Sequence, residues 1–331
     1  MPENVSTSLK GKKILLLYAK FFNYDKIVKE KLLSMGAVVD MYDARAELNV
    51  YEKALVKVYK GEFWHKLKNY HKRIQKEKAG VEYDIVFTNS YLPAETIDGY
   101  RKAFPKSKIV LYLDDSVLNT PDVENTFSRY DRVMTFDRDD SKHYNIGFLP
   151  LFFEDSYVLQ ECENPVYDLC FIGTIHSDRL KVIEAMENYC ANNGLQFYHF
   201  CYLQSRFIYY FYWLTKKEFR KKAPSFFSYE PLPSSAVADT IRKSKSVLDI
   251  QHPKQSGLTM RTIETLGARR KLITTNADIV NYDFYSPRNI TLIDRENPMI
   301  NKSFWETGYE SLNNNVFDKY SITNWIYSLF R

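Results

Sequence analysis

Residues 246–276 read SVLDIQHPKQSGLTMRTIETLGARRKLITTN, and they contain an apolar run at 246–250, a helical pattern at 260–266 and a second apolar run at 271–274. Strand, helix and strand in this order predict a crossover unit, because a helix usually carries the chain between two parallel strands. The same alternation recurs along the chain without an internal repeat. The sequence therefore predicts an α/β fold built on parallel sheets.

The alternation occurs in two blocks that meet near residues 150–165. In the first block we expect strands at 13–18, 38–41, 84–88, 109–113 and 132–136, with helices at 24–35, 52–78, 94–104 and 123–130. In the second we expect strands at 169–172, 196–201, 246–250, 271–274 and 290–293, with helices at 178–192, 236–244 and 260–266. A last amphipathic helix covers 318–330. Two blocks of this kind predict two Rossmann-like, doubly wound domains that face a cleft.

Composition narrows the class of protein and its compartment. The chain has 331 residues, of which 45% are hydrophobic and 26% charged, and this balance excludes a disordered or collagen-like protein. Residues 1–13 lack the apolar core of a secretory signal, and the longest strongly apolar stretch, 207–214, is far shorter than the roughly 20 residues of a membrane-spanning helix. The four cysteines lack metal-binding spacing. We expect a cytoplasmic protein.

Two segments, 53–80 and 206–222, combine basic residues with aromatic ones. In the second, a run of large apolar and aromatic side chains is followed by Lys216, Lys217, Arg220, Lys221 and Lys222. This combination fits an anionic membrane surface and also fits single-stranded nucleic acid. A third interpretation is a solvated helix whose aromatic side chains pack inward. No helix-turn-helix, zinc-finger or RRM signature is present in the sequence, which argues against nucleic acid.

Two glycine-containing turns in the second block lead into helices. Gly173 and Thr174 follow the expected strand over 169–172 and come shortly before Arg179, and free N–H groups at such a helix start attract phosphate. The alternative is a plain strand-to-helix turn with a surface arginine. The other turn, 255–264, places Gly257 before a helix that Thr259 is suited to cap.

The helix after Gly257 carries Arg261 and Glu264 three residues apart, hence on one face. An arginine near a helix N-terminus suits a diphosphate, and a carboxylate one turn further can accept hydrogen bonds from both hydroxyls of a ribose. The alternative is an exposed Arg261–Glu264 ion pair, which would contribute under about 1 kcal/mol. Together with Thr259, these residues favour a nucleotide.

Residues 256–276, SGLTMRTIETLGARRKLITTN, resemble the donor-binding motif of nucleotide-sugar glycosyltransferases of GT-B architecture, in particular bacterial capsule and lipopolysaccharide enzymes. The stretches YLDDS at 112–116, YDRVMTFD at 130–137 and FLPLF at 148–152 support the resemblance. It implies an N-terminal acceptor domain over 1–155, a nucleotide-sugar donor domain over 156–315, and a C-terminal helix over 316–331 that packs back on the N-terminal domain.

The resemblance also implies roles for individual residues. Glu264 would hold the donor ribose and Thr275 and Asn276 would line the sugar side. The diphosphate would lie along Gly173, Thr174, Arg179, Gly257, Thr259 and Arg261. The resemblance further implies that no metal ion is required, and that there is no cofactor, because the nucleotide sugar is a substrate. The developing negative charge on the diphosphate would be stabilised by backbone amides and arginines.

An inverting enzyme also needs a base for the acceptor hydroxyl. Asp115 is our choice, with Asp114 and His143 as alternatives, while a retaining enzyme would need no protein base. We expect a glycosyltransferase that moves a sugar to a polysaccharide or lipid-linked glycan in cell-surface polysaccharide synthesis, peripheral at the inner face of the membrane through 206–222. The alternatives are a non-catalytic nucleic-acid-binding protein and a nucleotide-sugar epimerase of the same architecture.

Overall fold

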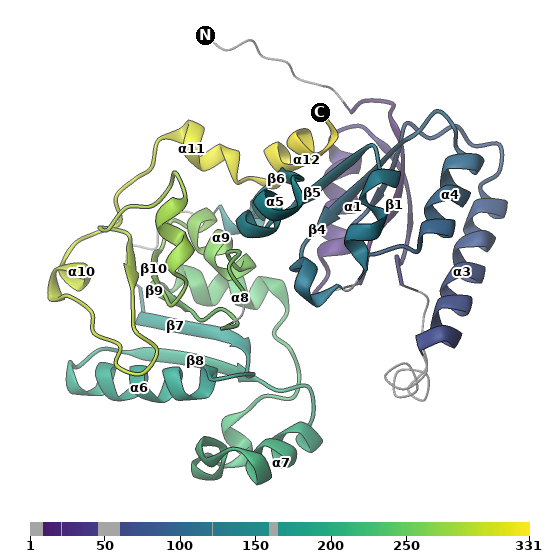
Figure 1. The fold of residues 1–331 in the computed structure, drawn as a ribbon. Helices are drawn as coiled ribbons and strands as arrows, with labels where there is room; N and C mark the ends of the chain where they lie inside the picture. Colours follow the sequence, from purple (N-terminus) through teal and green to yellow (C-terminus); the bar gives the residue numbers. More distant parts are fainter. Residues whose placement is uncertain (1–8, 21, 46–59, 121, 159–164, 254) are drawn as a thin grey trace. The chain divides into compact units, whose positions relative to one another are not determined.

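The chain forms two compact units, each built on one parallel sheet (Figure 1). The computed structural model describes residues 9–20, 22–45, 60–120, 122–158, 165–253 and 255–331. Unit 1 comprises Met1–Pro150 together with Ile322–Arg331, and unit 2 comprises Leu151–Ser321. The prediction of parallel α/β architecture in both halves of the chain is confirmed.

The sheet of unit 1 has the order β2-β1-β3-β4-β5-β6, with every neighbouring pair parallel. Its strands are β1 Lys13–Leu17, β2 Val38–Tyr42, β3 Ile85–Thr88, β4 Lys108–Leu113, β5 Arg132–Thr135 and β6 Gly147–Phe148. Its α-helices are α1 Tyr24–Ser34, α3 Lys60–Glu77, α4 Ala94–Ala103, α5 Arg138–Tyr144 and α12 Ile322–Phe330. Short 3-10 helices are η1 Val117–Asn119 and η2 Val123–Arg129. Of the helix expected over 52–78, residues 52–59 lie outside the described residues.

The core of unit 1 includes the end of the chain. Trp325 of α12 is 1% exposed, and its ring lies 4.9 Å from that of Tyr112 on β4 and 6.1 Å from that of Phe87 on β3, both edge-on. On α3, the buried His71 is within hydrogen-bond distance of the Tyr100 hydroxyl at 2.7 Å and of a backbone carbonyl at 3.0 Å. Burial lowers the pKa of His71 to about 4, so this imidazole is neutral at pH 7.

The sheet of unit 2 has the order β11-β10-β9-β7-β8, again parallel throughout. Its strands are β7 Tyr167–Thr174, β8 Phe197–Tyr202, β9 Ser244–Asp249, β10 Lys271–Thr274 and β11 Ile290–Leu292. Its α-helices are α6 Arg179–Asn192, α7 Arg206–Thr215, α8 Ser234–Arg242, α9 Met260–Gly267, α10 Lys302–Glu306 and α11 Asn314–Lys319. Its 3-10 helices are η3 Asp155–Tyr157, η4 Lys217–Lys221, η5 Pro224–Phe226 and η6 Ala277–Asn281.

The strand order of unit 2 reverses at β7. From β7 the chain goes outward to β8, then returns to β9 on the other side of β7 and continues to β10 and β11. Open parallel sheets bind ligands beyond the carboxyl ends of the two strands that flank such a reversal. In unit 2 those ends are Thr174 on β7 and Asp249 on β9. In unit 1 the corresponding strands are β1 and β3.

Candidate functional site

The start of α9 is tied to the end of β9 by a buried carboxylate. Thr259 caps the helix, since its hydroxyl oxygen accepts a hydrogen bond from the N–H of Thr262 at 3.3 Å. The Asp249 carboxylate in turn accepts hydrogen bonds from the Thr259 hydroxyl at 2.8 Å and from the Thr262 hydroxyl at 2.6 Å. Because these hydrogen bonds join the side chains of Asp249, Thr259 and Thr262, they fix the N-terminus of α9 at the reversal point of the sheet.

Arg261 and Glu264 form an ion pair on α9 that is largely buried. An Arg261 Nη atom donates to a Glu264 oxygen at 2.6 Å, and the two side chains are 18% and 4% exposed. The alternative of an exposed surface pair is therefore wrong. Burial raises the pKa of Tyr157, and the Glu264 carboxylate adds to this shift through its charge and a hydrogen bond.

Arg179 joins the carboxyl ends of β7 and β9. Its Nε donates to the carbonyl of Ile250 at 2.7 Å, and its Nη1 donates to the carbonyl of Thr174 at 2.9 Å. Gly173 lies directly beside it, because a Cβ on this glycine would be 3.5 Å from Arg179 Nη1. The guanidinium therefore occupies the reversal point itself, where the sequence had predicted a phosphate contact.

A third arginine, Arg295, completes a cationic group. Its Nη1 donates to both carboxylate oxygens of Asp178 at 2.8 and 2.9 Å, and its Nη2 donates to the carbonyl of Gln251 at 2.8 Å. Burial lowers the pKa of Arg179; the charge of Asp249 opposes this shift, and those of Arg295 and Arg261 add to it. Three guanidinium groups thus share one region, which favours a polyanionic ligand.

Sequence reasoning missed the role of Arg295, although the residue follows the expected strand over 290–293 closely. Asp178, at the start of α6, holds this arginine in place. It is the residue at the cap position, but its side chain accepts no hydrogen bond from the helix N–H groups.

Two imidazoles lie beside the arginines. The rings of His176 and His252 are 5.6 Å apart. Burial lowers the pKa of His176 to about 4, and the charges of Arg179, His252 and Lys216 add to this effect. Lys216, which follows α7, donates to the carbonyl of Ser177 at 2.9 Å. The end of α7 therefore reaches the turn before α6.

Asn276 and Thr275 are engaged in holding the neighbouring loops. The Asn276 amide donates to the carbonyls of Ser256 at 3.0 Å and Gly257 at 3.2 Å, which fixes the glycine turn against β10. Thr275 donates its hydroxyl hydrogen to the Gln251 side chain, whose amide donates back to the Thr275 carbonyl at 3.1 Å. The expected contact of Thr275 and Asn276 with the sugar stays a prediction.

Asp115, the base expected from the sequence, belongs to unit 1, whereas all the expected donor residues belong to unit 2. One Asp115 oxygen accepts hydrogen bonds from the N–H of Ser116 and from the Asn119 amide, both at 2.8 Å. These contacts shape the turn that leads into η1. His143 is exposed on α5, with its ring 4.6 Å from that of Tyr144.

Asp114, at the end of β4, has a different environment. An Asp114 oxygen accepts a hydrogen bond from the Asn89 amide at 2.7 Å. The Asn89 carbonyl oxygen accepts from the backbone N–H of Ala19 at 2.8 Å, so the orientation of this amide is fixed. Asp114 is exposed, yet protein atoms around its carboxyl group desolvate it and raise its pKa to about 6, while the Asn89 hydrogen bond opposes the shift.

Within the described ranges, no group of three or more His, Cys, Asp or Glu side chains is placed to hold a metal ion. No helix in the described part of the chain combines the length and apolar character needed to cross a bilayer.

Comparison with known proteins shows the fold. No family model matches the sequence, and no curated protein matches it. The chain is similar to a crystal structure of a glycosyltransferase from Rickettsia africae, with a TM-score of 0.60, 13% identity and 96% of each chain covered. It is also similar to HepE from Anabaena in complex with UDP-glucose, with a TM-score of 0.61, 10% identity, and 96% of this chain and 98% of that chain covered.

A third similar structure is the lipopolysaccharide outer core galactosyltransferase WaaB, with a TM-score of 0.52, 10% identity, and 96% of this chain and 99% of that chain covered. At these identities the likeness concerns architecture. The expected fold class is confirmed: two α/β units with parallel sheets, in the GT-B architecture.

Proposed function

We propose that the chain is a glycosyltransferase that takes a sugar from a nucleotide-sugar donor and transfers it to a polysaccharide or lipid-linked glycan in cell-surface polysaccharide synthesis. One observation carries the proposal. At the reversal point of the unit 2 sheet, three arginines converge beside a buried carboxylate, Glu264, on the first turns of a capped helix. The architecture is shared with HepE, which binds UDP-glucose.

The donor is bound by two kinds of group. The nucleotide diphosphate accepts hydrogen bonds from Arg179 and Arg261 and from free N–H groups at the starts of α6 and α9. The ribose hydroxyls donate to the Glu264 carboxylate. In the structure Arg261 donates a hydrogen bond to one Glu264 oxygen. Donor binding therefore replaces this ion pair with two new contacts: Arg261 binds the phosphate, and Glu264 accepts hydrogen bonds from the ribose.

The same groups assist the reaction. Cleavage of the sugar–phosphate bond leaves negative charge on the departing diphosphate, and prearranged arginines stabilise that charge with little reorganisation. In this mechanism we assign the base to Asp114 rather than to its neighbour Asp115, whose oxygen already accepts two hydrogen bonds within its turn. A carboxyl group with a pKa of about 6 is ionised at pH 7 and remains basic enough to accept the acceptor's proton.

Calorimetric titration with UDP, UDP-glucose and a panel of other nucleotide sugars tests the donor site. Glu264→Gln and Arg261→Met are expected to weaken binding of the preferred donor at least tenfold. Glu310→Gln is the matched control, because Glu310 is also an ion-paired glutamate of unit 2 but is exposed and pairs with Arg288. If both variants bind the donor as the wild type does, or if the folded wild type binds none of the panel, the proposal is wrong.

The membrane part of the proposal rests on α7. Ser205 caps this helix, and Tyr209 faces the core with 4% exposure. The opposite face carries exposed apolar side chains at i, i+3, i+4 and i+7, namely Phe207 at 79%, Tyr210 at 56%, Phe211 at 54% and Leu214 at 65%. Figure 1 shows α7 in green at the edge of unit 2, beyond β8.

Basic side chains follow this apolar stripe directly. Lys217, Arg220 and Lys221 on η4 are all exposed. An apolar stripe with adjacent cations suits the boundary between acyl chains and anionic headgroups. We therefore propose that α7 and η4 place the enzyme on an anionic membrane, where a lipid-linked acceptor would be found.

A further inference from the structure

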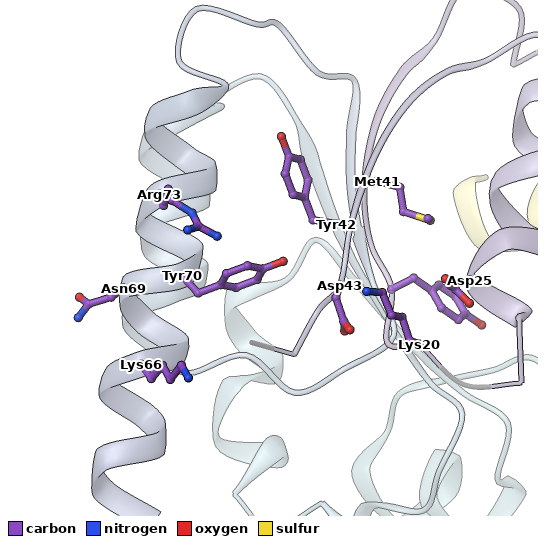
Figure 2. A pocket seen from close by; sticks show the side chains of 10 residues that line it. Lys20, Asp25, Met41, Tyr42, Asp43, Lys66, Asn69, Tyr70 and Arg73 are labelled. Atoms are coloured by element: carbon purple, nitrogen blue, oxygen red, sulfur yellow. The ribbon is translucent and has the colours of Figure 1, made fainter. Parts of the chain in front are cut away.

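Unit 1 contains a pocket that the donor site does not use. It has a volume of about 690 Å³, within the range of small-ligand sites. It lies at the carboxyl ends of β1 and β2, between the start of α1 and one face of α3 (Figure 2). The lining side chains are Tyr18, Lys20, Asp25, Met41, Tyr42, Asp43, Lys66, Asn69, Tyr70 and Arg73.

The two faces of α3 differ in a way that keeps the pocket polar. Leu67, His71 and Ile74 are buried against the rest of unit 1. The residues that line the pocket, Lys66, Asn69, Tyr70 and Arg73, recur at i, i+3, i+4 and i+7 and so share another face. Figure 2 shows Tyr70 and Arg73 reaching from the helix toward the strand ends.

The pocket combines aromatic surface with positive charge. Tyr42 on β2 and Tyr70 on α3 both contribute rings to the lining. The Arg73 guanidinium lies 5.5 Å from the centre of the Tyr70 ring and has no ion-pair partner among the described residues. Lys20 and Lys66 are exposed and line the pocket from the β1 side and from α3.

The two acids of the pocket are in part engaged elsewhere. Asp43 accepts a hydrogen bond from the N–H of Arg45 at 2.9 Å. Asp25 is 5% exposed and lies in the first turn of α1, where the helix dipole stabilises a carboxylate. The more exposed charges of the lining are therefore the cations. They suit an anionic group, while the tyrosine rings suit the apolar face of a sugar ring.

We propose that this pocket binds an anionic saccharide, a sugar ring that carries a carboxylate or phosphate group, as the acceptor of the transfer reaction. The role of this saccharide as acceptor rests on the proposed function, whereas the binding of an anionic sugar in the pocket does not. Arg73 and Lys66 bind the charged group, and Tyr70 and Tyr42 contact the ring. Hydroxyls of the sugar donate to Asp43.

The position of Tyr18 links the pocket to the proposed base. Tyr18 is buried at the end of β1 and lines the pocket. Burial raises the pKa of its hydroxyl, and among charges the strongest contributor is Asp114, followed by Tyr112 and Asp25. The Tyr18 hydroxyl therefore lies close enough to the Asp114 carboxylate to interact with its charge.

Ligand-detected NMR with the full chain tests the pocket directly. The probes are glucuronic acid, glucose 6-phosphate, glucose and inorganic phosphate. We expect both charged sugars to bind more tightly than glucose and than phosphate. Arg73→Ala and Tyr70→Ala should weaken the charged sugars at least tenfold. Lys72→Ala, which removes a charge from an exposed position of the same helix outside the pocket, should bind them as the wild type does.

Two results would overturn the inference. If phosphate binds as tightly as glucose 6-phosphate, the sugar ring contributes nothing and the pocket is a simple anion site. If Arg73→Ala, at an exposed position that folding does not depend on, leaves binding unchanged, the charged sugars bind elsewhere. Glu264→Gln separates this inference from the donor assignment, because it should leave binding of these probes unchanged while it weakens binding of nucleotide sugars.

Discussion

Replacing two phenylalanines on α7 should release the protein from anionic membranes. Phe207 and Phe211 are 79% and 54% exposed. If a phenylalanine presents roughly 200 Å², the two together offer about 270 Å² to a lipid surface. At about 25 cal/mol per Å², complete burial would contribute about 7 kcal/mol. A helix at the interface buries part of this area, so we expect Phe207→Ser with Phe211→Ser to cost about 3 kcal/mol, roughly a hundredfold in partitioning.

Sedimentation with sucrose-loaded vesicles of phosphatidylserine and phosphatidylcholine measures this partitioning. The matched control is Leu118→Ser with Met299→Ser, because these side chains are 70% and 69% exposed but lie outside α7. The control should sediment as the wild type does, and circular dichroism checks that both variants fold. If the α7 variant sediments with the wild type, or if the control loses as much binding, the stripe on α7 is not the membrane contact.

Three further predictions concern protonation and packing. Asp114→Asn should abolish transfer but raise Tm above pH 6, because the folded pKa of about 6 exceeds the unfolded value of roughly 3.9 and the fold therefore disfavours the ionised carboxylate. Asn89→Ala removes a hydrogen bond that lowers the pKa of Asp114, so it should move the acidic limb of the pH–rate profile to higher pH. A limb that does not move would contradict the assignment of Asp114 as the base. His176 has a folded pKa of about 4, so the free energy of unfolding in urea should fall as pH drops from about 6.5 to 4, and His176→Gln should make this slope shallower. Gly267→Ala should lower the free energy of unfolding by about 1–3 kcal/mol, because its Cβ would come within 2.6 Å of a ring carbon of Phe153. Gly308→Ala is the control, since its Cβ would have no atom within 4 Å, and it should change the free energy of unfolding little. Equal effects of the two changes would contradict this reasoning.

Much of the fold follows from periodicity. The expected strand over 271–274 is β10, Lys271–Thr274, and the helix expected over 24–35 is α1, Tyr24–Ser34. Short apolar runs next to amphipathic helices leave few arrangements other than a parallel sheet. The two-residue strand β6, Gly147–Phe148, was not expected, because so short an element has no period to detect and is defined only by its pairing with β5.

Contacts between distant segments explain what was missed at the site. From sequence, Asp114 and Asp115 differ by one position, and only the turn decides which carboxylate meets Asn89 and which holds Ser116. Asp249 ends an apolar strand, but the Thr259 hydroxyl that donates a hydrogen bond to it lies ten positions further along the chain. Charge pattern did indicate the apolar and basic character of α7 and η4, because that property belongs to consecutive residues.

The C-terminal helix α12 imposes an order on synthesis. A nascent chain emerges from the ribosome N-terminus first, and domains tend to fold as they emerge. The side chains of Phe87 and Tyr112 emerge early, yet the indole that covers them, Trp325, is made only after the whole of unit 2. Until translation has passed residue 325, the rings of Phe87 and Tyr112 therefore lack the cover that Trp325 provides. A fragment ending at residue 150 should accordingly be less stable than unit 1 with α12 in place.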